Sequence, residues 1–78
     1  MTIHRNTNYI KYRADRNTNV YNRGDVVECY KDYSGWHGYN TFDGTRFRTM
    51  TSILRSVPAE NVLEQDRREP SLSWRLAH

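Results

Sequence analysis

The sequence contains one cysteine, two prolines and four glycines among its 78 residues. A single cysteine excludes an intrachain disulfide and a metal site built from several thiolates. Because no disulfide supports so small a fold, we expect a reducing compartment and predict that the chain is cytoplasmic. The N-terminal residues lack the apolar run of a signal peptide, and no segment approaches the roughly 18 apolar residues of a membrane span. We therefore expect no membrane partner.

Aromatic residues supply much of the apolar surface. Six Tyr, two Trp and two Phe occur in a chain with 36% hydrophobic residues and a mean hydropathy of -1.00. Each aromatic side chain can bury on the order of 150–250 Å². This supply fills one small core, which predicts a single domain. The formal charge is +3, and Lys11 and Lys31 are the only lysines. Arginine therefore provides most of the cationic groups, and its planar fork suits phosphate or carboxylate.

Short segments rich in β-branched and aromatic residues are separated by turn residues, and no long window shows helical periodicity. Asp43-Gly44 indicates a hairpin, because glycine accepts a positive φ. The segment 49–57 has two interpretations: a strand bent by a bulge, or a strand that gives way to a helical turn at 52–55. Strands are predicted at 9–13, 25–31, 36–42, 45–52 and 62–64, with one 3-10 turn at 58–61.

The end of the chain has a different composition. From residue 66 it is charged and broken by Pro70, so residues 1–65 are predicted as the folded domain and 66–78 as a flexible C-terminal tail. Trp74 and Leu76 interrupt the polarity of the tail. They either dock on the domain, mark a contact point with a partner, or lie in a disordered segment.

The predicted core follows from strand alternation. Val27 and Cys29 face one side of their strand, and Glu28 and Tyr30 face the other. We expect Val27, Cys29, Val57 and Val62 to point into one interior, with Cys29 as a buried structural thiol.

Four motifs occur in order along the chain: Tyr9-Ile10-Lys11, Tyr21 with Gly24-Asp25, Gly35-Trp36-His37, and Val57-Pro58-Ala59-Glu60-Asn61-Val62. Together they resemble Src-homology-three (SH3) domains over residues 7–64. The resemblance implies an all-β fold, a small five-stranded SH3-like barrel. In that family a groove of aromatic residues accepts a proline-rich peptide, and by position Tyr9, Trp36 and Pro58 would line it. Lys11 and Asn61 stand where the family usually has Tyr, which argues against this ligand.

Catalytic chemistry finds little support in the sequence. His4, His37 and His78 have no metal-ligand spacing, and no glycine-rich phosphate loop is present. Cys29 and His37 could form a nucleophile and its base, but no third orienting group is evident. We predict a protein that is not an enzyme and uses no cofactor or metal.

Binding is the favoured activity, because residues 30–39 contain more aromatic side chains than one core needs. The leading hypothesis is an adaptor or inhibitor, similar to small phage-encoded proteins, that docks on a larger cytosolic protein as a monomer or homodimer. The predicted apolar anchors are Tyr9, Tyr33, Trp36 and Tyr39, with Arg46 and Arg48 as charged contacts.

Nucleic acid is the alternative partner. Basic and aromatic residues interleave in two segments, and small barrels hold single strands by stacking bases on aromatic rings beside phosphate contacts. The residues predicted for this function are Tyr12, Arg13, Arg46 and Arg48.

Overall fold

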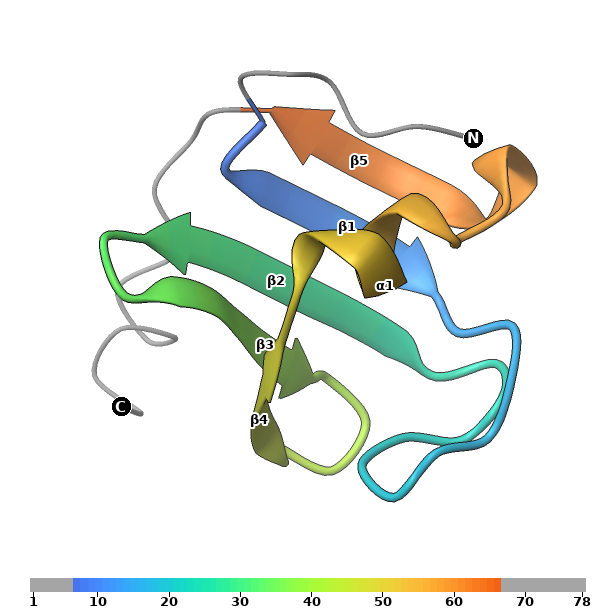
Figure 1. Ribbon diagram of the computed structural model, residues 1–78. Helices are drawn as coiled ribbons and strands as arrows, with labels where there is room; N and C mark the ends of the chain where they lie inside the picture. Colours follow the sequence, from blue (N-terminus) through green and yellow to red (C-terminus); the bar gives the residue numbers. More distant parts are fainter. Residues whose placement is uncertain (1–6, 67–78) are drawn as a thin grey trace.

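The computed structural model describes residues 7–66 (Figure 1). It confirms an all-β fold in which five strands form one antiparallel sheet of order β4-β3-β2-β1-β5. A short helix, α1 (Thr51–Arg55), and a 3-10 turn, η1 (Ala59–Asn61), connect β4 to β5. The predicted tail lies outside the described residues except for Asp66, which ends β5. The strands are β1 (Tyr9–Arg13), β2 (Val26–Asp32), β3 (Gly35–Asn40), β4 (Arg46–Thr49) and β5 (Val62–Asp66).

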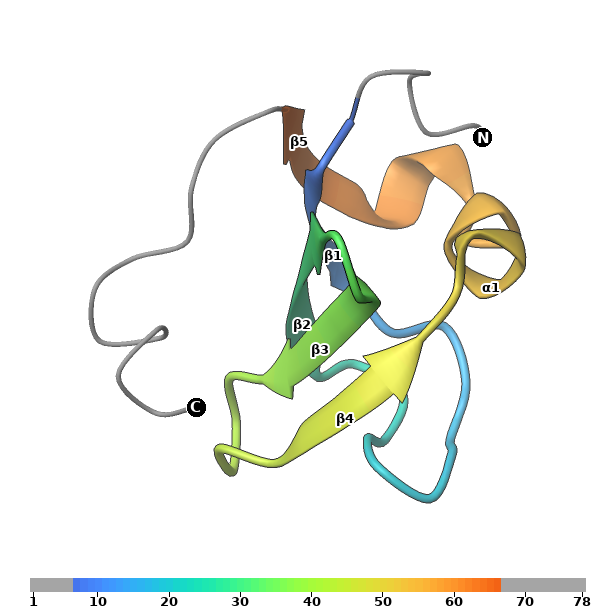
Figure 2. The ribbon, with the colours of Figure 1, turned by 60° about the vertical axis from the view of Figure 1, so that its left-hand side comes forward.

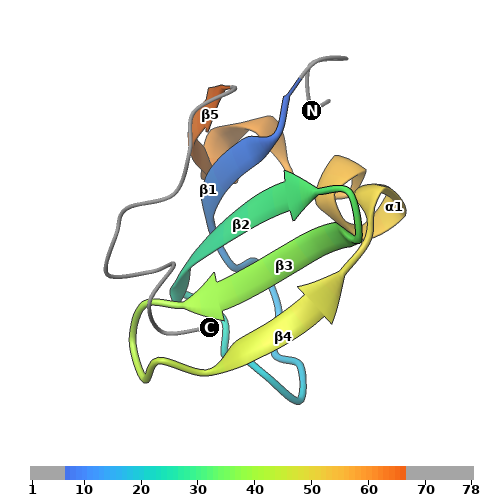
Figure 3. The ribbon, with the colours of Figure 1, turned by 90° about the vertical axis from the view of Figure 1, so that its left-hand side faces the viewer.

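The sheet is curved, and the helical connection lies on its concave side (Figure 2). Because the strand order is linear, β4 and β5 are the two edges. Both α1 and η1 cross the space between these edges. The concave side of the sheet therefore faces the core, and the convex side, called the outer face below, lies opposite (Figure 3).

The core combines alternate strand positions with residues from the helical connection. The expected interior of Val27, Cys29, Val57 and Val62 is confirmed: the first three are buried, and Val62 packs against them half-buried. Burial raises the pKa of the Cys29 thiol, as expected for a structural cysteine. Other buried members of the cluster include Ile10, Tyr12, Tyr21, Trp36 and Leu54.

The segment after β4 had two interpretations, a bent strand or a helical turn. The structure shows the helical turn. Leu54 in α1 is fully buried, and Thr51 accepts a hydrogen bond of 3.1 Å from Trp36 Nε1. Burial of Leu54 and this bond fix α1 against the sheet, although a five-residue helix has little stability of its own. The predicted 3-10 turn is also confirmed, since η1 begins directly after Pro58.

The predicted hairpin at Asp43-Gly44 is confirmed. Gly44 has a φ of 79°, and Asn40 N–H donates to the Thr45 carbonyl at 2.8 Å. This bond fixes the register of β3 and β4, which pairs Tyr39 with Arg46 and His37 with Arg48. The predicted bounds of β1 are confirmed, and those of the other strands differ from the observed ones by at most three residues; β3 and β4 end earlier than expected.

Candidate functional site

The outer face of the sheet gathers aromatic and cationic side chains. Its positions alternate with core positions along each strand, so their side chains point away from the interior. Cross-strand pairing then places them in rows, with directly opposite Cβ atoms about 4.5–5.5 Å apart. One row is Lys11, Glu28, Tyr39 and Arg46, and the other is Tyr9, Tyr30, His37 and Arg48.

Arg46 and Arg48 are the exposed cations that β4 contributes to this face. Both lie on β4, where exposed and half-buried residues alternate. Arg48 donates a hydrogen bond to the Ser34 carbonyl, whereas Arg46 makes no hydrogen bond or ion pair within residues 7–66. One guanidinium is thus held by the neighbouring turn, and the other has its donors available to a partner.

Tyr9 and Glu28 form a polar contact between neighbouring rows of the outer face. The Tyr9 hydroxyl donates to Glu28 Oε2 at 2.6 Å. Tyr9 is only 5% exposed, although it lies outside the core cluster. Tyr9 therefore contributes its hydroxyl contact and its bulk to this face but little accessible surface.

The turn between β2 and β3 carries a cluster of Asp32, Ser34 and His37. Asp32 Oδ1 accepts from Ser34 Oγ at 2.7 Å and lies 3.0 Å from His37 Nε2. The Ser34 hydroxyl, followed by His37, lowers the pKa of Asp32 to about 2. The carboxylate therefore stays ionised and holds the turn, together with a bond from the Ser34 amide.

The same three residue types form catalytic triads, but the geometry differs. In a triad the serine and the carboxylate contact opposite ring nitrogens of the histidine. Here Ser34 Oγ and Asp32 Oδ1 both lie 3.0 Å from His37 Nε2, and the hydroxyl bonds directly to the carboxylate. Cys29 and His37 do not meet either, because Cys29 faces the core and His37 faces outward. Asp32, Ser34 and His37 instead hold the turn between β2 and β3.

Of the residues predicted as binding contacts, most reach the outside of the molecule. Tyr39, Arg46 and Arg48 are brought together on the outer face. Tyr33 is fully exposed at the turn between β2 and β3. Tyr9 lies on the outer face but is nearly covered.

The prediction that Trp36 is a surface anchor is wrong. Trp36 is 3% exposed, because the alternation of β3 turns it toward the core together with Gly38 and Asn40. Its ring nitrogen bonds to Thr51 in α1. Tyr9 and Trp36 thus lie on opposite faces of the sheet, so the peptide groove implied by the resemblance is not formed.

Tyr12 was predicted to contact nucleic acid, and this is also wrong. Tyr12 is 1% exposed and its hydroxyl lies 3.5 Å from that of Tyr21. Burial raises its pKa, as expected for a core phenol. Arg13 is exposed and donates to the Gly24 carbonyl at 3.1 Å, so it is partly occupied by the loop before β2.

Four outer-face residues were not among the predicted contacts: Lys11, Glu28, Tyr30 and His37. Alternation within β2 already placed Glu28 and Tyr30 away from the core. What the sequence did not provide was the cross-strand register, which sets these residues beside Tyr39 and Arg48.

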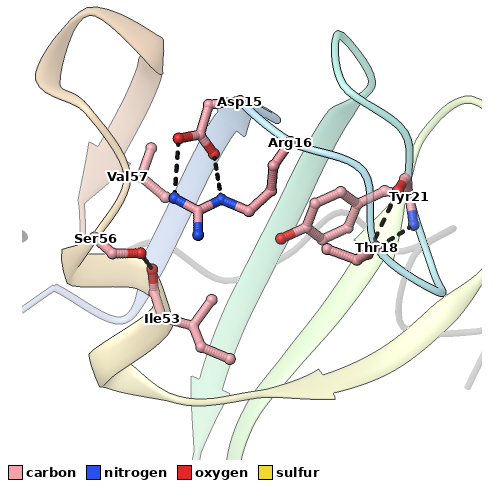
Figure 4. Close-up of a pocket in the computed structure, with 7 residues that line it drawn as sticks. All are labelled: Asp15, Arg16, Thr18, Tyr21, Ile53, Ser56 and Val57. Atoms are coloured by element: carbon pink, nitrogen blue, oxygen red, sulfur yellow. Dashed lines mark hydrogen bonds and ion pairs between the residues drawn. The ribbon is translucent and has the colours of Figure 1, made fainter.

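A small hollow lies on the other side of the molecule, between the loop after β1 and the segment from α1 to Val57 (Figure 4). Its volume is about 220 Å³. Asp15 and Arg16 form an exposed ion pair of 3.2 Å at this hollow, and the Arg16 guanidinium lowers the pKa of Asp15. The remaining lining is Thr18, Tyr21, Ile53, Ser56 and Val57.

No family model matches the chain, and no match is found among curated proteins or solved structures. Within residues 7–66 there is no group of three or more His, Cys, Asp or Glu side chains placed to hold a metal ion. The helices in that part of the chain are also too short or too polar to cross a bilayer.

Proposed function

We propose that this chain is a non-catalytic binding module of the SH3-like barrel type that docks on a larger cytosolic protein through the outer face of its sheet. The SH3-like assignment is supported by the strand order, in which four consecutive strands form a meander and the fifth returns to β1. The 3-10 turn directly before β5 agrees with it.

One observation carries the docking proposal: Tyr39, Arg46 and Arg48 occupy neighbouring positions on β3 and β4, on the side away from the core. Tyrosine and arginine are the residue types that contribute most to interface energetics. Both arginines project from an ordered strand, so the backbone that carries them does not have to be ordered on binding.

Charge indicates the chemistry of the partner surface. Arg46 and Arg48 lie two residues apart on one face of β4, and neither forms an ion pair with a carboxylate of residues 7–66. Guanidinium groups bind carboxylates in a bidentate manner. An acidic protein surface is therefore the complementary partner. Tyr33, in the turn beside Arg48, adds a fully exposed aromatic ring at the rim of the outer face.

Affinity capture from a nuclease-treated lysate of the cells that make the chain tests this proposal. The wild-type protein is compared with Arg46→Glu and with Arg55→Glu, an exposed residue of α1 with the same charge change. We expect a protein that is retained by the wild type and by Arg55→Glu and is lost with Arg46→Glu. Equal retention by both variants would exclude the outer face as the docking surface.

Nucleic acid is the other outcome of this test. A titration with random single- and double-stranded oligonucleotides at low salt detects it, and phosphate-dominated binding falls steeply as salt rises. Binding of oligonucleotides that depends on Arg46 and is lost at high salt, with no captured protein, would replace the proposal. The burial of Tyr12 removes one of the stacking residues that this function would use.

A further inference from the structure

The strand β4 has an unpaired backbone edge beside its two arginines. Within residues 7–66 it is the terminal strand of the sheet and pairs only with β3. In an antiparallel pair, opposite residues alternate between positions that exchange backbone hydrogen bonds with the partner and positions that do not. Asn40 N–H bonds to the Thr45 carbonyl, so the next bonded positions on β4 are Phe47 and Thr49. The backbone groups of Arg46 and Arg48 therefore point away from the sheet.

No other described residue forms a hydrogen bond to this edge. The loop and turn hydrogen bonds within residues 7–66 include none to the amide or carbonyl of Arg46 or Arg48, and both residues are exposed. In Figure 3 β4 forms the margin of the sheet, with α1 beyond its end. Two amides and two carbonyls are thus available in the pattern that an added strand uses.

We propose that β4 accepts an extended acidic segment of the partner as an additional antiparallel strand. This inference rests on the proposed function and names how the partner binds. Side chains at alternate positions of a strand share a face and lie roughly 6.5–7 Å apart. Carboxylates two residues apart on the segment match Arg46 and Arg48 on the outer face. Met50, 57% exposed directly after β4, offers an apolar contact near the end of the added strand.

Charge argues against a second copy of this chain as the added strand. If β4 paired with itself about a two-fold axis centred on Phe47, Arg46 of one copy would lie opposite Arg48 of the other. Like charges directly across a strand pair are destabilising. Charged side chains such as these arginines protect an edge strand from self-association. An acidic segment would instead be attracted by the two guanidinium groups.

Amide hydrogen exchange measured by NMR tests the inference in two steps. In the free protein, the amides of Arg46 and Arg48 should exchange rapidly, whereas those of Phe47 and Thr49 should be protected. The probe is a blocked eight-residue peptide in which glutamate alternates with valine, with matched glutamine and lysine peptides as controls. We expect only the glutamate peptide, at up to millimolar concentration, to slow exchange at Arg46 and Arg48.

Two variants separate the backbone from the charge. Arg48→Gln removes the guanidinium and keeps the amide, and should weaken binding of the glutamate peptide about five- to tenfold. Arg48→Pro also removes the outward amide, and proline is tolerated at such an edge position. This variant should weaken binding of the glutamate peptide by about a further fivefold. Equal affinities of the two variants would show that the backbone is not used.

Three results would overturn strand addition. These are protection of Arg46 and Arg48 in the free protein, peptide binding without their protection, and no peptide binding at all. Each leaves the outer-face proposal standing if Arg46→Glu still abolishes protein capture while Arg55→Glu does not. A different result would refute the outer-face proposal itself: equal capture of the partner protein by Arg46→Glu and Arg55→Glu.

Discussion

The ring of Phe47 fills the space above Gly38 on the neighbouring strand. A Cβ atom built at Gly38 would lie 2.3 Å from Phe47 Cε2, closer than any relaxed contact. The Phe47 ring is held from the other side by Tyr21, with ring centroids 5.7 Å apart. Gly38 thus lets β4 pack closely on β3, and this packing positions Arg46 and Arg48.

Gly38→Ala should therefore destabilise the protein. Overpacking of this kind costs about 1–3 kcal/mol, measured as the free energy of unfolding in urea. Phe47→Leu is the companion variant, because a smaller side chain leaves room for the added methyl group. The double variant should be less destabilised than the sum of the two single ones. Simple additivity would show that the two residues do not compete for this space.

Thr51→Val should loosen α1 from the sheet. The substitution keeps the shape of Thr51 and removes the acceptor of the Trp36 ring nitrogen. Leaving a buried donor unpaired costs about 1–3 kcal/mol, and the fluorescence of Trp36 should change with it. Ser52→Ala, at an exposed position of the same helix, is the control and should stay within about 0.5 kcal/mol of the wild type.

Tyr9→Phe tests the polar contact of the outer face. It removes the hydroxyl that donates to Glu28 at 2.6 Å, and a hydrogen bond to a charged group contributes about 1.5–3 kcal/mol. Tyr33→Phe removes the same group from a fully exposed ring and should leave the unfolding free energy unchanged. Equal stability of the two variants would indicate that the bond to Glu28 contributes nothing.

The turn between β2 and β3 should give the protein part of its acid sensitivity. The pKa of Asp32 falls from 3.8 to about 2 on folding, so its ionised form favours the folded state. This stabilisation is complete above pH 3.8 and is lost as the pH falls through about 2. Asp32→Asn should be less stable than the wild type at neutral pH, and the difference should shrink in that acid range.

Urea unfolding as a function of pH measures this effect. Glu60→Gln, an exposed residue of η1 with the same change in charge, is the control for loss of a carboxylate elsewhere. A constant stability difference between the wild type and Asp32→Asn from neutral pH to pH of about 2 would contradict the role assigned to the turn.

The strands, the hairpin at Gly44 and the buried Cys29 could be predicted from the sequence, because turn residues and alternation are local patterns. Local patterns did not determine whether the segment that forms α1 is a helix or a strand. A strand and a helical turn both fit the β-branched residues before Val57, and only the tertiary contacts of Leu54 and Trp36 decide between them.

The candidate site was predictable only in part for a similar reason. Arg46 and Arg48 share a face because they are two residues apart, and the sequence shows this directly. The position of Trp36 depends on which face of β3 turns inward. Gly38 shares that inward face, and the Phe47 ring occupies the space that a side chain at Gly38 would need. The pairing of Tyr39 with Arg46 likewise depends on the register, which the turn before β4 fixes.

The dissociation constant of the captured complex tests the central claim most directly. Arg46→Glu/Arg48→Glu is compared with Arg23→Glu/Arg55→Glu, whose residues are exposed, lie off the sheet and change the net charge equally. Reversing charges that meet carboxylates at the interface should weaken binding about 30-fold or more, whereas the control should bind within about twofold of the wild type. Equal affinities for the two double variants would contradict docking through the outer face.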